Sequence, residues 1–153
     1  MNKSDTIESF SLIGLAVRTT NANYQSAKDI PALWERFFAE NTLERIPDKV
    51  ESTIYCLYTD YEKDHTAPYT TIIGCKVKNL NNIPAGLVGK QVTGGDYMKF
   101  TARGKAADKV VFNAWMEIWN SGIRRAYTTD IEVWGEKSQD PDQAEIDILV
   151  AVN

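Results

Sequence analysis

The residues best suited to chemistry stand in one short stretch, in which two carboxylates and an indole alternate with aliphatic side chains. If Tyr127 to Glu136 form a strand, its period of two places Asp130, Glu132 and Trp134 on one face and turns the aliphatic residues between them toward a core. A carboxylate beside an aromatic ring can bind a cation, or act as a general acid or base when burial raises its pKa. The solvated face of an antiparallel strand is the alternative interpretation.

The length and composition describe an ordinary globular chain. Its 153 residues, 43% hydrophobic and 25% charged, are enough for one domain spanning residues 1–153 whose core needs no disulfide or metal ion to stabilise it. A net charge of -4 argues against a protein that grips phosphate backbones. The sequence contains no apolar run as long as a signal peptide or a membrane span, so we expect a cytoplasmic location.

The cysteine and histidine content argues against a metal centre. The only candidates are Cys56, Cys75 and His65, and their spacing matches no zinc motif. We therefore expect no metal and no cofactor, and we expect both thiols to be small buried hydrophobes.

The elements that position these residues follow from apolar periodicity. One helix is expected to begin at the N-cap Asp29, with Pro31 in its first turn and a broad apolar face that places Trp34 and Phe38 in the core. A second helix is expected from Ala106 to Ser121, ended by Gly122. The expected strands are Phe10–Arg18, Thr53–Tyr61, Tyr69–Val77, one strand broken at Gly94–Gly95 that joins Lys90–Thr93 to Asp96–Ala102, Tyr127–Glu136 and Ala144–Val152, with a connector at Thr42–Glu51.

The order of these elements repeats, because a strand, a helix and two strands are followed by the same series. Residues 32–38 parallel residues 113–119, with Trp34 opposite Trp115. A duplicated strand-helix-strand-strand unit, with halves at about 9–78 and 88–152, explains this pattern. We expect an α+β fold: an antiparallel sheet, both helices on one face, and a ligand groove between the halves.

The groove predicted by this repeat is bordered by the two aromatic strands. Overlaying the halves matches Cys56 with Glu132 and Tyr58 with Trp134. Aromatic residues also dominate cores, so every tyrosine and tryptophan outside the Asp130 to Trp134 stretch has a core role as its alternative. The candidate ligand-binding residues are Glu132, Trp134, Tyr58 and Tyr97, followed by Tyr55, Tyr69 and Trp115.

A series of motifs runs in order over about Ser9 to Val152: Ile-Gly-Leu, Leu-Trp, Ile-Tyr-x-x-Tyr-x-x-Tyr, Gly-Gly-x-Tyr-x-x-Phe, a tryptophan-containing second helix, and Thr-Asp-Ile-Glu-Val-Trp. This order of motifs resembles that of the GyrI-like effector-binding domain. The resemblance implies a duplicated fold whose groove takes amphipathic small molecules, often lipophilic cations, around a buried glutamate. That glutamate corresponds to Glu132, and the aromatic residue two positions later, usually tyrosine in the family, is Trp134 here.

Three functions remain open at this point. The first is a free-standing bacterial binding domain for amphipathic, cationic small molecules, with a role in transcription regulation, multidrug sensing or sequestration. The second is a GyrI-like hydrolase of reactive electrophiles, in which Glu132 transfers protons and Tyr58 or Tyr97 orients the substrate. The third is a gyrase-inhibitor type of protein interaction. We favour binding over turnover, with no direct nucleic acid or membrane contact, and leave a protein partner and a homodimer open.

Overall fold

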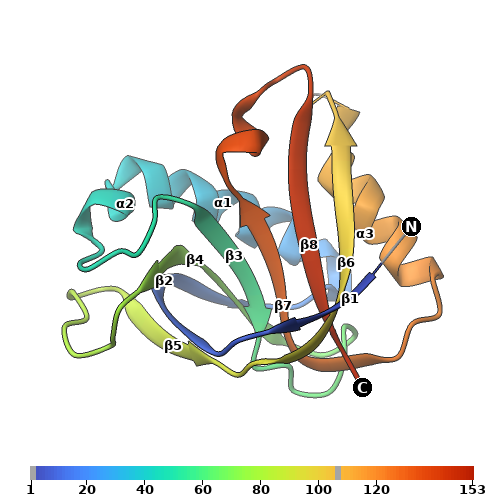
Figure 1. Ribbon diagram of the computed structural model, residues 1–153, viewed down its shortest axis with the longest axis horizontal. Helices are drawn as coiled ribbons and strands as arrows, with labels where there is room; N and C mark the ends of the chain where they lie inside the picture. Colours follow the sequence, from blue (N-terminus) through green and yellow to red (C-terminus); the bar gives the residue numbers. More distant parts are fainter. Residues whose placement is uncertain (1–2, 106–107) are drawn as a thin grey trace.

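The computed structural model describes residues 3–105 and 108–153. It is an α+β fold in which one curled antiparallel sheet carries its long helices on one face, as predicted (Figure 1). The strands are β1 (Lys3–Ile7), β2 (Phe10–Thr19), β3 (Ile54–Thr59), β4 (Tyr69–Val77), β5 (Val88–Val92), β6 (Gly95–Gly104), β7 (Arg125–Trp134) and β8 (Ala144–Val152), and the α-helices are α1 (Ser26–Ala39), α2 (Thr42–Arg45) and α3 (Val110–Asn120).

The strand order is symmetric about the centre of the sheet. It runs β1-β6-β8-β7-β3-β4-β2-β5, so that β2, β3 and β4 hold the places that β6, β7 and β8 hold on the other side. At the centre β3 pairs with β7, and Cys56 lies directly opposite Glu132. The duplicated unit read from the sequence is therefore visible in the sheet order.

The two edge strands are exchanged between the halves, and the sequence-based assignment was wrong here. β1, which was not predicted, pairs with β6, whereas β5 pairs with β2. The stretch expected as one strand broken at Gly94–Gly95 is thus two strands in different places. The chain crosses between them at Gly94, where an added Cβ would lie 2.5 Å from the Ile7 carbonyl oxygen and where the amide donates to Ser9 Oγ (2.8 Å).

Each long helix packs on its own half of the sheet. Leu33 and Phe37 of α1 are buried against β2, β3 and β4, and Ala114 and Ile118 of α3 are buried against β6 and β8. Trp134 packs against both clusters. The two helices therefore flank the centre of the sheet, over the β3–β7 junction.

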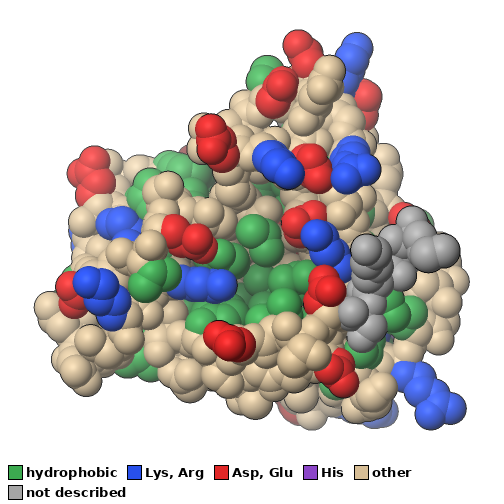
Figure 2. All heavy atoms as spheres, in the orientation of Figure 1, with side chains coloured by type: hydrophobic (Ala, Val, Ile, Leu, Met, Phe, Trp, Pro, Cys, Tyr) green, Lys and Arg blue, Asp and Glu red, His purple; other side chains and the backbone are tan. Residues whose placement is uncertain are grey.

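The face of the sheet opposite the helices forms a separate core. Its cluster joins Val92 in one edge strand with Ile7 in the other, so the sheet curls toward this side. Figure 2 shows hydrophobic side chains gathered in the hollow of this face and ringed by charged ones. Gly14 and Gly74 pair across β2 and β4, where an added Cβ would meet backbone atoms at 2.1–2.2 Å. This close approach requires glycine on both strands.

Several helix boundaries differ from the prediction. α1 begins at Ser26, so Asp29 lies in its first turn, where its carboxylate accepts from Thr19 Oγ1 (2.9 Å) and Gln25 Nε2 (3.0 Å), and Pro31 lies within the helix. The expected connector contains α2 and one isolated bridge, Lys49 to Val77. The second helix was expected to start at Ala106, which lies outside the described ranges. It ends just before Gly122, the expected stop residue, which has φ 73°.

Candidate functional site

A cavity of about 440 Å³ opens between α1 and α3, above the centre of the sheet. Its floor comes from β3 and β7, its two walls come from the helices, and one end is bordered by the β3–β4 turn. Aromatic and aliphatic side chains dominate the lining. The lining residues are Asn21, Ser26, Ala27, Ile30, Pro31, Trp34, Tyr58, Tyr61, His65, Tyr69, Val111, Phe112, Trp115, Trp119, Arg125, Glu132 and Trp134.

Glu132 stands at the floor of this cavity with both carboxylate oxygens hydrogen-bonded. Oε2 accepts from the Tyr58 hydroxyl and from Trp115 Nε1, each at 2.7 Å, and Oε1 accepts from Trp134 Nε1 at 2.9 Å. The side chain is only 2% exposed. Among the described residues no lysine, arginine or histidine forms an ion pair with it. The carboxylate is therefore held by neutral donors alone.

Burial and hydrogen bonding act on the charge of Glu132 in opposite directions. Burial raises the pKa of the Glu132 carboxyl above its ordinary value, and the hydrogen bonds from Tyr58, Trp115 and Trp134 oppose that rise. Both indoles can only donate, so they favour the acceptor, which is the ionised form. A positive charge brought into the cavity would stabilise the carboxylate further.

The rings around Glu132 pack edge to face and so hold one another in place. Tyr58 meets Trp115 with ring centroids 5.5 Å apart and planes at 88°, and Trp34 meets Trp134 at 5.2 Å and 66°. Tyr69 adjoins Tyr58 at 6.1 Å, and its hydroxyl donates to Asn21 Oδ1 at 2.7 Å. Rigid aromatic walls around a carboxylate suit a flat or bulky cation, because ring faces attract positive charge.

A second carboxylate, Asp130, lies on the same strand but does not reach the cavity. Its Oδ2 accepts from Arg125 Nη2 at 2.7 Å and from the Tyr61 hydroxyl, and its Oδ1 accepts from the Ala151 amide at 3.2 Å. Burial raises the pKa of Asp130, while Arg125 and these hydrogen bonds lower it. Arg125 and Tyr61 line the cavity in place of Asp130.

Five of the seven predicted ligand-binding residues lie around the cavity and two do not. Tyr55 and Tyr97 are buried in the core on the opposite face of the sheet. The Tyr55 hydroxyl donates to Glu51, and the Tyr97 hydroxyl donates to the Thr93 carbonyl oxygen at 3.2 Å. Strand alternation explains the position of Tyr55, because Tyr55 and Tyr58 are three residues apart in β3 and so point to opposite faces of the sheet. The residues that do line the cavity are Glu132, Trp134, Tyr58, Tyr69 and Trp115.

Several residues around the cavity were not among the candidates. Tyr61 turns to the groove because Asp60, with φ 50°, ends the strand alternation just before it. His65, expected in a charged turn, reaches the cavity mouth and lies 3.2 Å from the Tyr127 hydroxyl. Trp34, assigned to the core, packs against the core cluster of the first half and also borders the cavity. Phe38, also assigned to the core, is 57% exposed.

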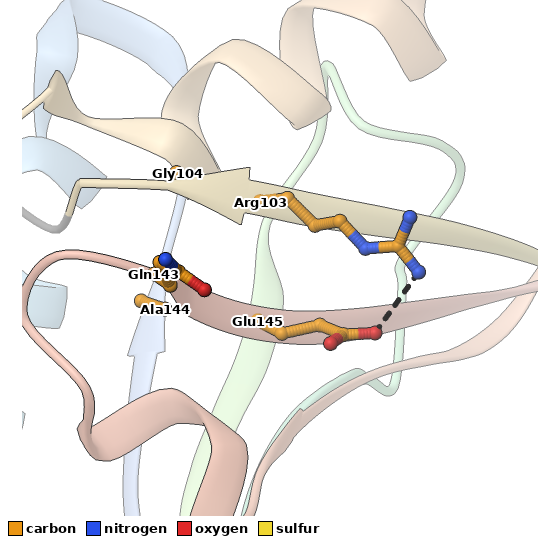
Figure 3. A pocket seen from close by; sticks show the side chains of 5 residues that line it. All are labelled: Arg103, Gly104, Gln143, Ala144 and Glu145. Carbon is orange, nitrogen blue, oxygen red and sulfur yellow. Dashed lines mark hydrogen bonds and ion pairs between the residues drawn. The ribbon is translucent and has the colours of Figure 1, made fainter.

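The thiols and a second hollow add no chemistry to this site. Cys56 and Cys75 are buried and free, as predicted, and burial raises the pKa of both. The second hollow lies where β6 and β8 run side by side (Figure 3), and its main feature is an ion pair between Arg103, whose side chain is 72% exposed, and Glu145. Such a pair is a solvated surface contact. No cluster of three metal-ligating side chains occurs within residues 3–105 and 108–153.

The curled symmetric sheet and its helix-flanked groove are those of a GyrI-like effector-binding domain, which confirms the resemblance seen in the sequence. Residues 5–152 match the family model of Cass2, described as an integron-associated effector binding protein. The chain belongs to this family.

Individual relatives agree with this assignment. The solved integron cassette protein VCH_CASS2, from the mobile metagenome of Vibrio cholerae, is 33% identical, with a TM-score of 0.77 over 99% of this chain and 95% of that one. YobU of Bacillus subtilis (strain 168), named as a candidate transcriptional regulator, is 27% identical over 91% of this chain and 89% of its own length. SAV2435, solved with tetraphenylphosphonium bound, is 17% identical and shares the fold, with a TM-score of 0.82 over 100% of this chain and 94% of that one.

Proposed function

We propose that this effector-binding protein is a cytoplasmic receptor for amphipathic, monovalent organic cations, with Glu132 as the counter-ion. The observation that carries the proposal is the buried Glu132 carboxylate, which has three neutral donors, no cationic partner among the described residues and a place on the floor of an aromatic cavity. An ionised carboxylate out of water is costly unless a positive charge compensates it. A cationic ligand supplies that charge.

The cavity favours a ligand that is large and weakly hydrated. Its volume of about 440 Å³ lies within the usual range for small-molecule pockets. Burial of apolar ligand surface contributes about 25 cal/mol per Å², and each ring face adds about 0.5–2 kcal/mol for a cation. A small, strongly hydrated cation gains neither contribution. The tetraphenylphosphonium bound by SAV2435, a protein of the same fold, is a cation of the favoured kind.

The family and one relative support a role in sensing. Effector binding is the described property of the Cass2 family, and YobU is named as a candidate transcriptional regulator. We propose that the bound cation is reported to a transcription apparatus through a protein partner, or is held by sequestration. Within the described residues no helix is long and apolar enough to span a membrane.

The hydrolase alternative finds less support in the geometry. A general base needs a lone pair directed at a water or substrate, whereas side-chain donors occupy three of the roughly four acceptor sites of the Glu132 carboxylate. Asp130, the other carboxylate of this region, is paired with Arg125. Tyr97, proposed to orient a substrate, lies in the opposite core.

The direct experiment is a titration with tetraphenylphosphonium, followed by intrinsic tryptophan fluorescence. Trp34, Trp115 and Trp134 border the cavity, so binding should quench the emission saturably. Glu132→Gln keeps the size of the side chain and removes its charge. We expect it to weaken binding at least tenfold, about 1.4 kcal/mol.

Glu136→Gln is the matched control. Glu136 lies just after the end of β7 and does not line the cavity. It should bind the cation as the wild type does. Equal binding by the Glu132→Gln protein and the wild type would overturn the counter-ion role. Consumption of a reactive electrophile at a rate that depends on Glu132 would favour the hydrolase instead.

A further inference from the structure

A buried ion pair lies beside the aromatic groove, and the counter-ion role of Glu132 makes no use of it. Arg125 Nη2 stands 2.7 Å from Asp130 Oδ2, with the arginine side chain 7% exposed and the aspartate 0%. Arg125 and Tyr61 line the cavity, whereas Asp130 does not. The arginine and the tyrosine therefore close off a second carboxylate that would otherwise face the ligand.

An irregularity in β7 places Arg125 over Asp130. Arg125 pairs with Val152 of β8 and Asp130 pairs with Val150, so five steps along one strand accompany two along the other. In a regular strand, residues five apart lie on opposite faces and roughly 16–17 Å from each other. The bulge contains Tyr127 in a left-handed conformation (φ 56°), which an aromatic residue seldom adopts. The local backbone thus departs from regular geometry at the point that brings the arginine to this carboxylate.

The surroundings of the guanidinium match those proposed for a bound cation. Its central carbon lies 4.5 Å from the centroid of the Tyr127 ring and 5.8 Å from that of Trp115, which also donates to Glu132. Within the described part of the chain, the buried Arg125 Nε has no hydrogen-bond partner. The Arg125 side chain is thus held by Asp130 and by ring faces, and its N–H groups do not all have hydrogen-bond acceptors.

We propose that Arg125 determines the charge selectivity of the groove by acting as a built-in cation for Asp130. The proposal rests on the proposed function, since it takes Glu132 as the counter-ion of the ligand. Asp130 and Glu132 are two residues apart on one face of a regular stretch of β7, about 6.5–7 Å along the strand. With Arg125 in place, the groove offers one uncompensated carboxylate and accepts a monocation. Without it, two carboxylates at this spacing would suit a dication.

The test compares two probes with one biaryl skeleton: the monocation N-methyl-4-phenylpyridinium and the dication methyl viologen. Calorimetry gives the affinity of each probe for the wild type, Arg125→Met, and the double variant Arg125→Met with Asp130→Asn. We expect the wild type to bind the monocation at least as tightly as the dication. Arg125→Met should raise the ratio of dication to monocation affinity at least tenfold. The double variant should return that ratio to the wild-type value.

Two results would overturn the proposal. One is an unchanged ratio in Arg125→Met, and the other is an equal rise in the double variant, which would mean that Asp130 is not the second site. If Arg125→Met fails to fold, the affinity ratio is compared between the wild type and the double variant. A tenfold preference of the wild type for methyl viologen then contradicts the proposal. The affinity of Glu132→Gln for the monocation separates the two proposals. If this variant binds the monocation as tightly as the wild type does, the proposed function itself is refuted.

Discussion

The two halves of the sheet share a backbone arrangement and differ in chemistry where they meet. At the centre, β3 contributes Cys56 and Tyr58, and β7 contributes Glu132 and Trp134 at the corresponding positions. Tyr58 donates to Glu132 from one half, and Trp134 donates from the other. A symmetric scaffold thus builds a site with one acidic group, surrounded by donors from both sides.

Electrostatics explains why the symmetry ends at the central pair. Side chains directly opposite on antiparallel strands have Cβ atoms about 4.5–5.5 Å apart. Two buried carboxylates at that distance could not both ionise, because each would raise the pKa of the other. A thiol opposite Glu132 avoids the repulsion and, since burial raises its own pKa, stays neutral. The difference between the halves follows from placing one charge near the symmetry axis.

The largest expected effect comes from removing this asymmetry. Cys56→Asp would place a second buried carboxylate opposite Glu132 with no cation to pair with, and we expect the free energy of unfolding at pH 7 to fall by about 3–5 kcal/mol. Urea denaturation measures this change. Cys56→Ala, which removes the thiol and adds no charge, should cost only about 0.5–2 kcal/mol. Similar losses in both variants would refute the electrostatic explanation.

Removing the Tyr58 hydroxyl tests how much the first half of the sheet stabilises the Glu132 carboxyl group of the second half. Tyr58→Phe keeps the ring and deletes the hydroxyl that donates to Glu132. A hydrogen bond is worth about 0.5–1.5 kcal/mol between neutral groups and about 1.5–3 kcal/mol to a charged group, so the free energy of unfolding at pH 7 should fall by about 0.5–3 kcal/mol. Tyr24→Phe, at an exposed ring, is the control and should change nothing measurable. A stable Tyr58→Phe protein would mean that water replaces the hydroxyl.

The halves also differ in how closely their strands approach. Gly14 and Gly74 face each other in the first half, whereas Lys99 and Leu149 hold the corresponding places in the second. Gly74→Ala would place a Cβ 2.1 Å from the Ile13 carbonyl oxygen, and we expect a loss of about 1–3 kcal/mol in thermal or urea unfolding. Gly135→Ala, whose Cβ would meet only ordinary contacts at 3.6 Å, should stay within about 0.5 kcal/mol. Equal losses would show that close approach is not the cause.

The last prediction is a pH dependence of stability carried by Glu132. Burial raises the pKa of Glu132, so the folded state keeps a proton that the unfolded chain releases near the ordinary value of 4.5. The free energy of unfolding therefore falls as pH rises from that value through the raised pKa, by about 1.4 kcal/mol for each pH unit that separates the two. Glu132→Gln lacks this loss, so its stability relative to the wild type should rise between pH 4 and pH 8. A difference that is constant with pH would contradict the raised pKa.

Periodicity and turn chemistry were enough to predict most of the framework. The apolar alternation of β3, β4, β7 and β8 and the stop at Gly122 are local features, so they are readable from the sequence. β1 was missed because its Lys-Ser-Asp-Thr-Ile sequence is polar and becomes a strand only by pairing with β6. The exchange of β1 and β5 between halves is likewise a long-range event that leaves no local pattern.

The candidate site was only partly accessible from the sequence. Glu132 and Trp134 follow from strand alternation, but Tyr55 was included against it and lies in the opposite core. Arg125 and Tyr61 escaped prediction because left-handed residues, Tyr127 and Asp60, reset the alternation beside them. Tyrosine seldom adopts this conformation, and aspartate, although enriched in it, adopts it too rarely for the sequence alone to place it. Backbone irregularities therefore decided which side chains surround the two carboxylates.

The most direct test of the central claim compares two ligands of nearly identical shape and opposite charge. Tetraphenylphosphonium and tetraphenylborate bury similar apolar area, so the ratio of their affinities isolates the sign of the charge that the groove accepts. With Glu132 as the proposed counter-ion, calorimetry on the wild type should show the cation binding at least 100-fold more tightly than the anion, about 2.7 kcal/mol. In Glu132→Gln the ratio should fall at least tenfold. Comparable affinities for both ions in the wild type would contradict the account.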